Sequence, residues 1–202
     1  MADAEEKKSP ESEKKLNGKQ EIVMYLHDMV YMISVLLVVF LVVFRVIVVS
    51  GSSMYDTLID GDYLLLLSNV FYREPEAGDI IVVAKESFDN GNPIIKRVIA
   101  TEGQTVDIDF VSGVVYVDGK ALHEPYTHTP TNVDEGMKFP LTVDKNCVFA
   151  MGDNRNGSLD SRSPQIGQVD HREILGKALF LFLPGVDKGH SGPEYDRIGA
   201  IK

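Results

Sequence analysis

Cysteine is almost missing from this chain, which has one, Cys147, among 202 residues. No intrachain disulfide can therefore form. A lone cysteine without a histidine pattern beside it is more typical of a buried small apolar residue than of a nucleophile.

Positively charged residues are also scarce. The chain has 20 lysines and arginines against 30 aspartates and glutamates, so its net charge is −10. Because nucleic-acid binding depends on neutralising phosphates, this balance gives no support to a nucleic-acid partner.

Metal-ligand and phosphate-binding patterns are missing as well. His123-Glu124 is not part of an H-E-x-x-H motif, and Pro125 would break the helix that such a motif needs. The loop after Asp153 is not an EF-hand, because Arg155 stands where an oxygen ligand is required. No glycine-rich phosphate loop precedes a helix. We therefore predict neither a metal nor a cofactor.

A long apolar run is what the chain does contain. Met29–Phe44 is uncharged and strongly apolar, and it is slightly shorter than the roughly 20 residues that cross a bilayer core. Tyr25-Leu26 and Arg45 extend it, since arginine can place its charge among the head groups. The alternative, a buried core helix, would require a large core around it. We predict a single transmembrane helix over residues 25–45.

Basic residues near the run indicate its orientation. On its N-terminal side lie Lys14, Lys15 and Lys19. On the other side only Arg45 is close, and the next basic residue is Arg73. The positive-inside rule then places residues 1–24, which have the composition of a disordered tail, in the cytoplasm and the rest outside. A cleaved signal peptide is the competing interpretation, but its charged region would be unusually long.

From residue 46 onward, short apolar runs alternate with turn signals, which predicts a mainly β domain over 46–184. Asp60-Gly61-Asp62 and Asn90–Pro93 are turns of this kind, and each precedes a strand-like run. Residues 102–146 contain shorter alternating strands and a polar loop, so we predict a smaller β insertion there. Residues 185–202 form a polar tail.

Two segments carry side chains that together could catalyse a reaction. The first, Ser50–Leu58, follows the apolar run directly and contains Ser53. A serine needs a base to act as a nucleophile, and Ser-Gly-Ser-Ser is also typical of an ordinary linker. The second, Pro93–Ile99, contains Lys96 between apolar neighbours. A lysine in a strand usually points to water, but burial would lower its pKa by the roughly two units that a base near pH ~8 needs.

A third segment is dense in hydrogen-bond donors and acceptors. This third motif segment, Met151–Arg162, contains Gly-Asp-Asn-Arg, then Ser158, and ends Asp-Ser-Arg. Ser158 could bond to the lysine amine and orient it, Asp160 and Arg162 could pair, and Asp153 could reach Arg97. No histidine lies in the three segments, so a Ser-His-Asp triad would have to be assembled in space.

In this order the three segments resemble those of the type I signal peptidases, the Ser/Lys proteases that remove secretory signal peptides. The resemblance runs from about Met29 to Pro184. It implies that Ser53, which directly precedes a methionine as in the family, is the nucleophile, and that Lys96 is the general base. It implies catalytic support from Ser158. Structural roles are implied for four charged residues: Arg97, Asp153, Asp160 and Arg162.

Some positions depart from the family pattern. Asp56 stands where the family usually has proline, which bears on the rigidity of that turn. Gly51 lacks the hydroxyl that some members place there for the oxyanion, so backbone N–H groups such as that of Ser53 must suffice. A lysine where the endoplasmic-reticulum members carry histidine, and the single membrane segment, are similar to the bacterial forms, in particular the Gram-positive ones.

The resemblance implies a membrane-anchored serine endopeptidase of the cell membrane. Its partners would be membrane lipid and secretory preproteins with small residues at the first and third positions before the cut. A shallow apolar substrate pocket is predicted from five residues near the pair: Val49, Met54, Leu58, Ile94 and Ile95. The alternative from another class is a catalytically silent, membrane-tethered β module that binds extracellular partners.

Overall fold

A computed structural model describes residues 18–86, 88–187 and 191–201, in two compact units that divide at Leu41. The first unit contains most of helix α1, Gly18–Val43, which is long and apolar enough to cross a membrane and buries none of its side chains. The helix begins upstream of the predicted membrane segment. Of the polar tail predicted over 1–24, residues 1–17 lie outside the described residues, and residues 18–24 belong to α1.

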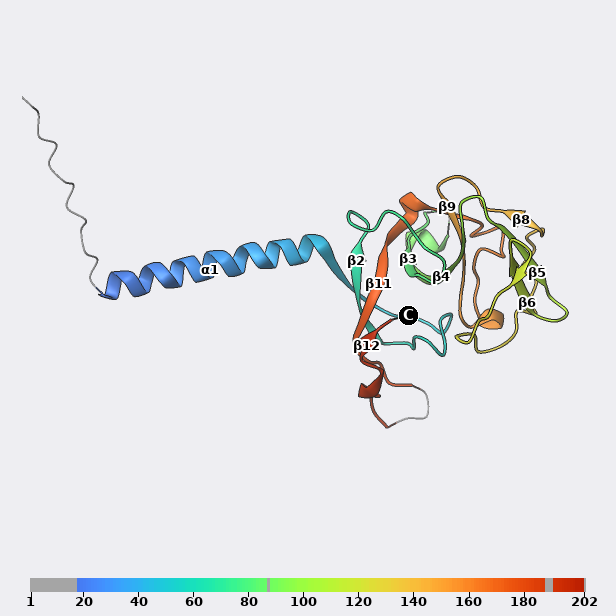
Figure 1. Ribbon diagram of the computed structural model, residues 1–202. Helices are drawn as coiled ribbons and strands as arrows, with labels where there is room; N and C mark the ends of the chain where they lie inside the picture. The colour runs from blue at the N-terminus through green and yellow to red at the C-terminus, as the bar shows by residue number, and fades with distance from the viewer. Residues whose placement is uncertain (1–17, 87, 188–190, 202) are drawn as a thin grey trace, which may run out of the picture. The chain divides into compact units, whose positions relative to one another are not determined.

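The second unit is mainly β, as predicted, and is built on an eight-stranded sheet. Its strand order is β1-β2-β11-β3-β4-β9-β10, with β12 paired to β11, and all its described pairs are antiparallel (Figure 1). The bounds are β1 Phe44–Val48, β2 Tyr63–Ser68, β3 Ile80–Val83, β4 Ile94–Thr101, β9 Cys147–Met151, β10 Val169–Asp170, β11 Ile174–Leu183 and β12 Gly199–Ala200. The predicted polar tail over 185–202 therefore contains the short strand β12. Its residues, glycine and alanine, do not favour a strand, so it was not predicted.

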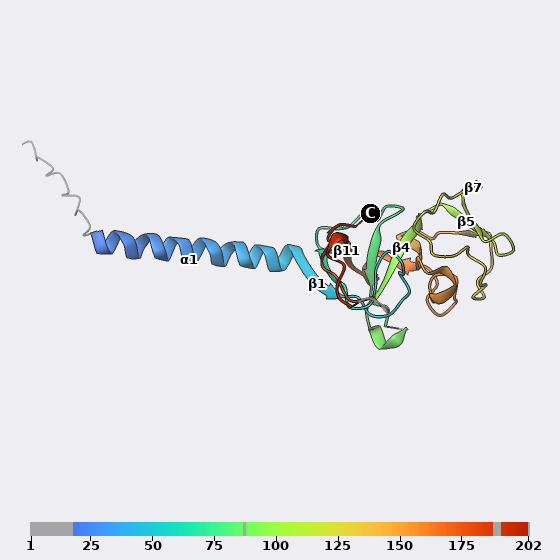
Figure 2. The same ribbon diagram turned by 90° about the horizontal axis from the view of Figure 1, so that it is seen from below.

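A smaller four-stranded sheet lies within the predicted insertion, since β4 ends at Thr101 and β9 begins at Cys147. Its order is β7-β6-β5-β8, and Figure 2 shows β5 and β7 beyond β4. The bounds are β5 Thr105–Asp109, β6 Val114–Val117, β7 Lys120–Ala121 and β8 Leu141–Thr142. The described residues also form short 3-10 helices: η1 Asp89–Gly91, η2 Arg155–Gly157, η3 His171–Glu173 and η4 Tyr195–Arg197.

Packing around β4 explains why this strand is apolar almost throughout. Its six central residues are all buried, because core residues cover both faces of the sheet there. The two charged residues of this strand, Lys96 and Arg97, are therefore buried as well. Met54 and Leu58 belong to one of these cores, so they fasten the segment after β1 to the sheet.

Candidate active site

Ser53 and Lys96 meet although 43 positions separate them in the sequence. The Lys96 Nζ lies 2.9 Å from the Ser53 Oγ, within hydrogen-bond distance, and Lys96 is only 4% exposed. Burial lowers the pKa of Lys96 to about 8, against the opposing charges of Asp160 and Glu135. About half of the amine is then neutral near pH ~8, and a neutral amine can accept the proton of a serine hydroxyl.

The turn after β9 holds the serine segment in place. Asn154 donates from its backbone N–H to the Ser53 carbonyl at 3.0 Å and from its side chain to the Ser52 carbonyl at 3.1 Å. Gly152 lies so close that a Cβ there would be 2.5 Å from the Ser53 carbonyl oxygen and 2.2 Å from the Ser158 hydroxyl. Any residue with a Cβ would therefore clash at position 152, and only glycine fits there. These roles of Gly152 and Asn154 were not predicted from the sequence, although both residues lie in the third motif segment.

Arg97 and Asp153 form the ion pair that the sequence predicted. Arg97 pairs with Met151 in the sheet, so the turn that follows β9 begins beside its guanidinium. Two nitrogens of Arg97 donate to the two carboxylate oxygens of Asp153, at 2.8 and 2.7 Å. Arg97 also lies over the ring of Tyr126 at 4.0 Å, and Asp153 accepts a hydrogen bond from Thr57. The pair thus links β4, the β9 turn and the serine segment.

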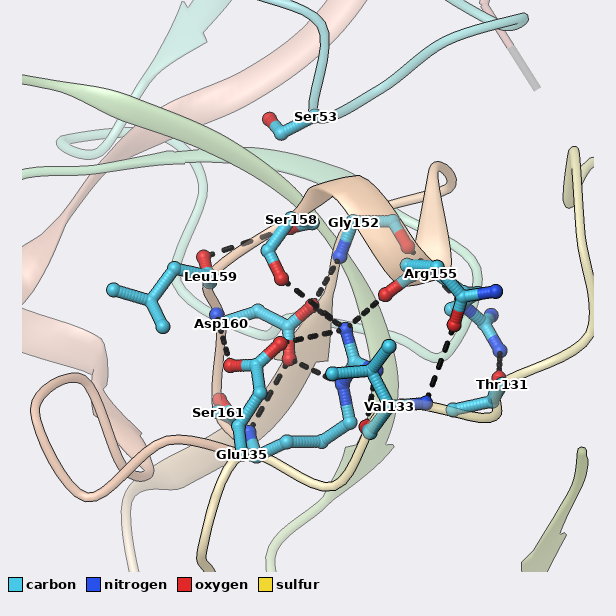
Figure 3. A network of polar contacts seen from close by, with 12 residues as sticks. Ser53, Thr131, Val133, Glu135, Gly152, Arg155, Ser158, Leu159, Asp160 and Ser161 are labelled. Carbon is cyan, nitrogen blue, oxygen red and sulfur yellow. Dashed lines mark hydrogen bonds and ion pairs between the residues drawn. The ribbon is translucent and has the colours of Figure 1, made fainter. Parts of the chain in front are cut away.

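Asp160 and Arg162 also pair, as predicted, through two bonds of 2.8 Å. Glu135 joins them: its carboxylate lies 3.0 Å from the Arg162 guanidinium and accepts the Asp160 N–H at 3.2 Å. Burial and the charge of Asp160 raise the pKa of Glu135 to about 7. Figure 3 shows this network below Ser53. Glu135 was not predicted, because it stands in a polar loop without a pattern.

Ser158 is next to this network, but it does not orient Lys96 in the described structure. Its hydroxyl donates to the Leu159 carbonyl at 3.5 Å, a long contact, and no bond to Lys96 is formed within the described residues (Figure 3). Ser158 is 7% exposed and packs against Gly152. Its supporting role in catalysis stays a prediction.

A groove of about 400 Å³ opens beside Ser53 and Lys96. Four of the five predicted pocket residues line it: Val49, Met54, Ile94 and Ile95. The structure differs for Leu58, which is 1% exposed and packs in the core instead. A local turn, in which the Leu58 N–H donates to the Met54 carbonyl at 2.9 Å, places Leu58 in that core, whereas Met54 also lines the groove.

Among the described residues, no histidine is bonded to Ser53, so no Ser-His pair is assembled in space. His128 contacts the serine segment, since its Nδ1 lies 2.9 Å from the carboxylate of Asp56. Both side chains are largely exposed. Asp56, which stands where the family pattern has proline, is therefore in hydrogen-bond contact with His128.

We expect Arg97→Met to destabilise the fold strongly. Asp153 is fully buried, so the substitution leaves its charge without its guanidinium partner and costs about 3–5 kcal/mol of unfolding free energy. Denaturant titration of the detergent-solubilised chain measures this. The matched control is Arg172→Met, which breaks the solvent-exposed pair with Asp170 and should leave stability near that of the wild type. Equal stability of both variants would contradict the bracing role of Arg97.

Comparison with known proteins identifies the family of this chain. The pattern of the family described as "Signal peptidase, peptidase S26" matches residues 22–183. A probable signal peptidase I-1 of Synechocystis sp. is 37% identical over 71% of this chain and 74% of its own. Signal peptidase I of Bacillus amyloliquefaciens is 36% identical over 70% and 75%. A crystal structure of a signal peptidase I from Enterococcus faecalis V583 matches with a TM-score of 0.42, at 30% identity, over 52% of this chain and 96% of that one. This chain therefore belongs to the signal peptidase family, peptidase S26, and is a hydrolase.

Proposed function

We propose that this protein cleaves signal peptides from secretory preproteins by a Ser/Lys mechanism. The observation that carries the proposal is the 2.9 Å contact between the buried Lys96 amine and the Ser53 hydroxyl. Neutral Lys96 accepts the hydroxyl proton as Ser53 Oγ attacks the scissile carbonyl. The Ser53 N–H stabilises the oxyanion, and protonated Lys96 returns the proton to the leaving amine. Lys96 then activates the water that hydrolyses the acyl-enzyme.

The supporting residues hold Ser53 and Lys96 in position relative to each other. Arg97 and Asp153 fix the β9 turn against β4, and Asn154 bonds to the serine segment from that turn. Asp160 and Arg162 brace the loop that carries Ser158. Because a displacement of about 1 Å can cost 100-fold in rate, loss of this bracing should lower the rate of cleavage.

Substrate specificity follows from the groove beside Ser53. β1 is the edge strand of the large sheet, so an extended substrate can pair beside it with alternate side chains facing the groove. The walls of the groove are apolar at Val49, Met54 and Ile95, and these side chains are already packed in a core. A packed wall cannot retreat to admit bulk, so small residues at the first and third positions before the cut are favoured.

A preprotein series that varies only the first position tests the proposed function. We expect efficient cleavage after alanine and a loss of kcat/KM of at least about 100-fold with leucine or phenylalanine there. The purified, detergent-solubilised chain is incubated with each substrate, and mass spectrometry locates the cut. Equal cleavage after alanine and phenylalanine would rule out this pocket, and no cleavage of any preprotein would rule out the function.

The membrane arrangement is part of the proposal. α1 anchors the protein in the cell membrane, in contact with lipid, and the lysines before it keep the N-terminus in the cytoplasm. The β domain then lies outside, where translocated signal peptides emerge. We expect protease added to intact protoplasts to degrade the region after Arg45 and to spare an epitope placed before α1. The reverse pattern would separate the enzyme from its proposed substrates.

A further inference from the structure

A second cavity adjoins the segment that carries Ser53. Its volume is about 530 Å³, and it shares no lining residue with the groove that contains Lys96. Ser52 lines this cavity, whereas the next residue, Ser53, lines the groove. The serine segment is therefore a wall common to both, and the nucleophile stands at their boundary.

The course of a bound substrate follows from this boundary. With the scissile carbonyl at Ser53, the residues before the cut occupy the groove. If the substrate continues in the same direction, the chain after the cut passes Ser52 and Tyr55, which both line the second cavity. In an extended chain alternate side chains share a face, so the first and third residues before the cut and the second residue after it all point to the enzyme. The side chain of that second residue is the one placed to enter the cavity.

Two carboxylates line the cavity among the described residues. Asp60 and Asp187 line it, and its described lining residues include no lysine or arginine. One oxygen of Asp60 accepts the Gly51 N–H at 2.8 Å, and Asp187 accepts the Tyr55 hydroxyl at 3.3 Å, so both carboxylates are tied to the serine segment. The charges of Asp187 and Asp56 raise the pKa of Tyr55, which reflects the same negative potential.

We propose that this cavity is the subsite for the second residue after the scissile bond, and that Asp60 and Asp187 favour a cationic side chain there over an anionic one. The inference rests on the proposed signal-peptide cleavage, because that function defines the substrate and its direction across Ser53. The preference is electrostatic and partly exposed to solvent, so it weakens as salt concentration rises.

The test uses three preproteins that differ only at the second position after the cut, with alanine, lysine or glutamate. The full chain in detergent is assayed for kcat/KM at low salt. We expect lysine to exceed glutamate by about tenfold, and by about threefold or less in 0.5 M NaCl. A ratio near one, with the alanine substrate cleaved normally, overturns the subsite and leaves the proposed function intact. No cleavage of the alanine substrate overturns both.

Substitutions assign the preference to this cavity. Asp187→Asn should reduce the lysine-to-glutamate ratio toward one, and Asp187→Lys should favour glutamate. Asp144→Asn, an exposed change that does not line the cavity, makes the same change in net charge and should preserve the wild-type ratio. The ratio compares two substrates on one enzyme, so a partial loss of folded protein cancels. An unchanged ratio in Asp187→Lys would overturn the proposal.

Discussion

Ser53→Ala is expected to reduce kcat/KM for a preprotein by on the order of 10⁴-fold or more, because Ser53 is the serine whose hydroxyl contacts the Lys96 amine. The side chain is partly exposed, and the hydrogen bond it loses is the one to Lys96. The segment itself stays anchored through Met54, which is 1% exposed, and through the backbone bond from Asn154. The fold should therefore survive, and circular dichroism with a thermal melt checks this.

Ser52→Ala is the matched control. The Ser52 carbonyl, not its hydroxyl, accepts the bonds from Asn154 and Tyr55, and alanine keeps that carbonyl. We expect this variant to retain activity within about tenfold of the wild type. If Ser53→Ala cleaved preproteins at the wild-type rate while folded, the nucleophile would have to be another residue.

Lys96→Arg is expected to be nearly inactive, with a loss of about 10³-fold or more, since guanidinium stays protonated at any working pH and cannot accept the Ser53 proton. The larger planar group must also fit a position that is 4% exposed. Single-turnover assays of variant and wild type at pH ~9 measure the loss. A variant that keeps the rate of the wild type would show that Lys96 is not the base.

The pH dependence of kcat/KM distinguishes the loss of a proton acceptor from a structural change in the site of Lys96→Arg. Lys96 has its pKa lowered to about 8, and its neutral form is the active one, so kcat/KM should rise as pH passes through that value. Between pH ~7 and ~9 the neutral fraction grows about tenfold. Lys96→Arg should show no such rise. A wild-type profile centred on pH ~6 would instead indicate a histidine base.

Features that depend on a short stretch of chain, such as the long apolar helix and the strands, could be predicted from the sequence alone. An uncharged apolar run is enough to predict a helix that can cross a membrane, and the apolar pattern after it predicts strands such as β4 and β11. The ion pairs Arg97–Asp153 and Asp160–Arg162 were hypotheses drawn from the charged residues of the motif segments, and the structure contains both pairs.

The contacts between remote side chains, and the cavities beside them, depend on the tertiary structure and could not be predicted from the sequence. The large sheet places β11 between β2 and β3, a long-range pairing that no local propensity encodes. The same packing turned Leu58 into the core, brought Glu135 from a patternless loop to Arg162, and left Ser158 without a bond to Lys96 in the part of the chain described. The sequence supplies the reactive residues, and the sheet order sets their distances, because contacts between remote segments depend on how the whole chain packs.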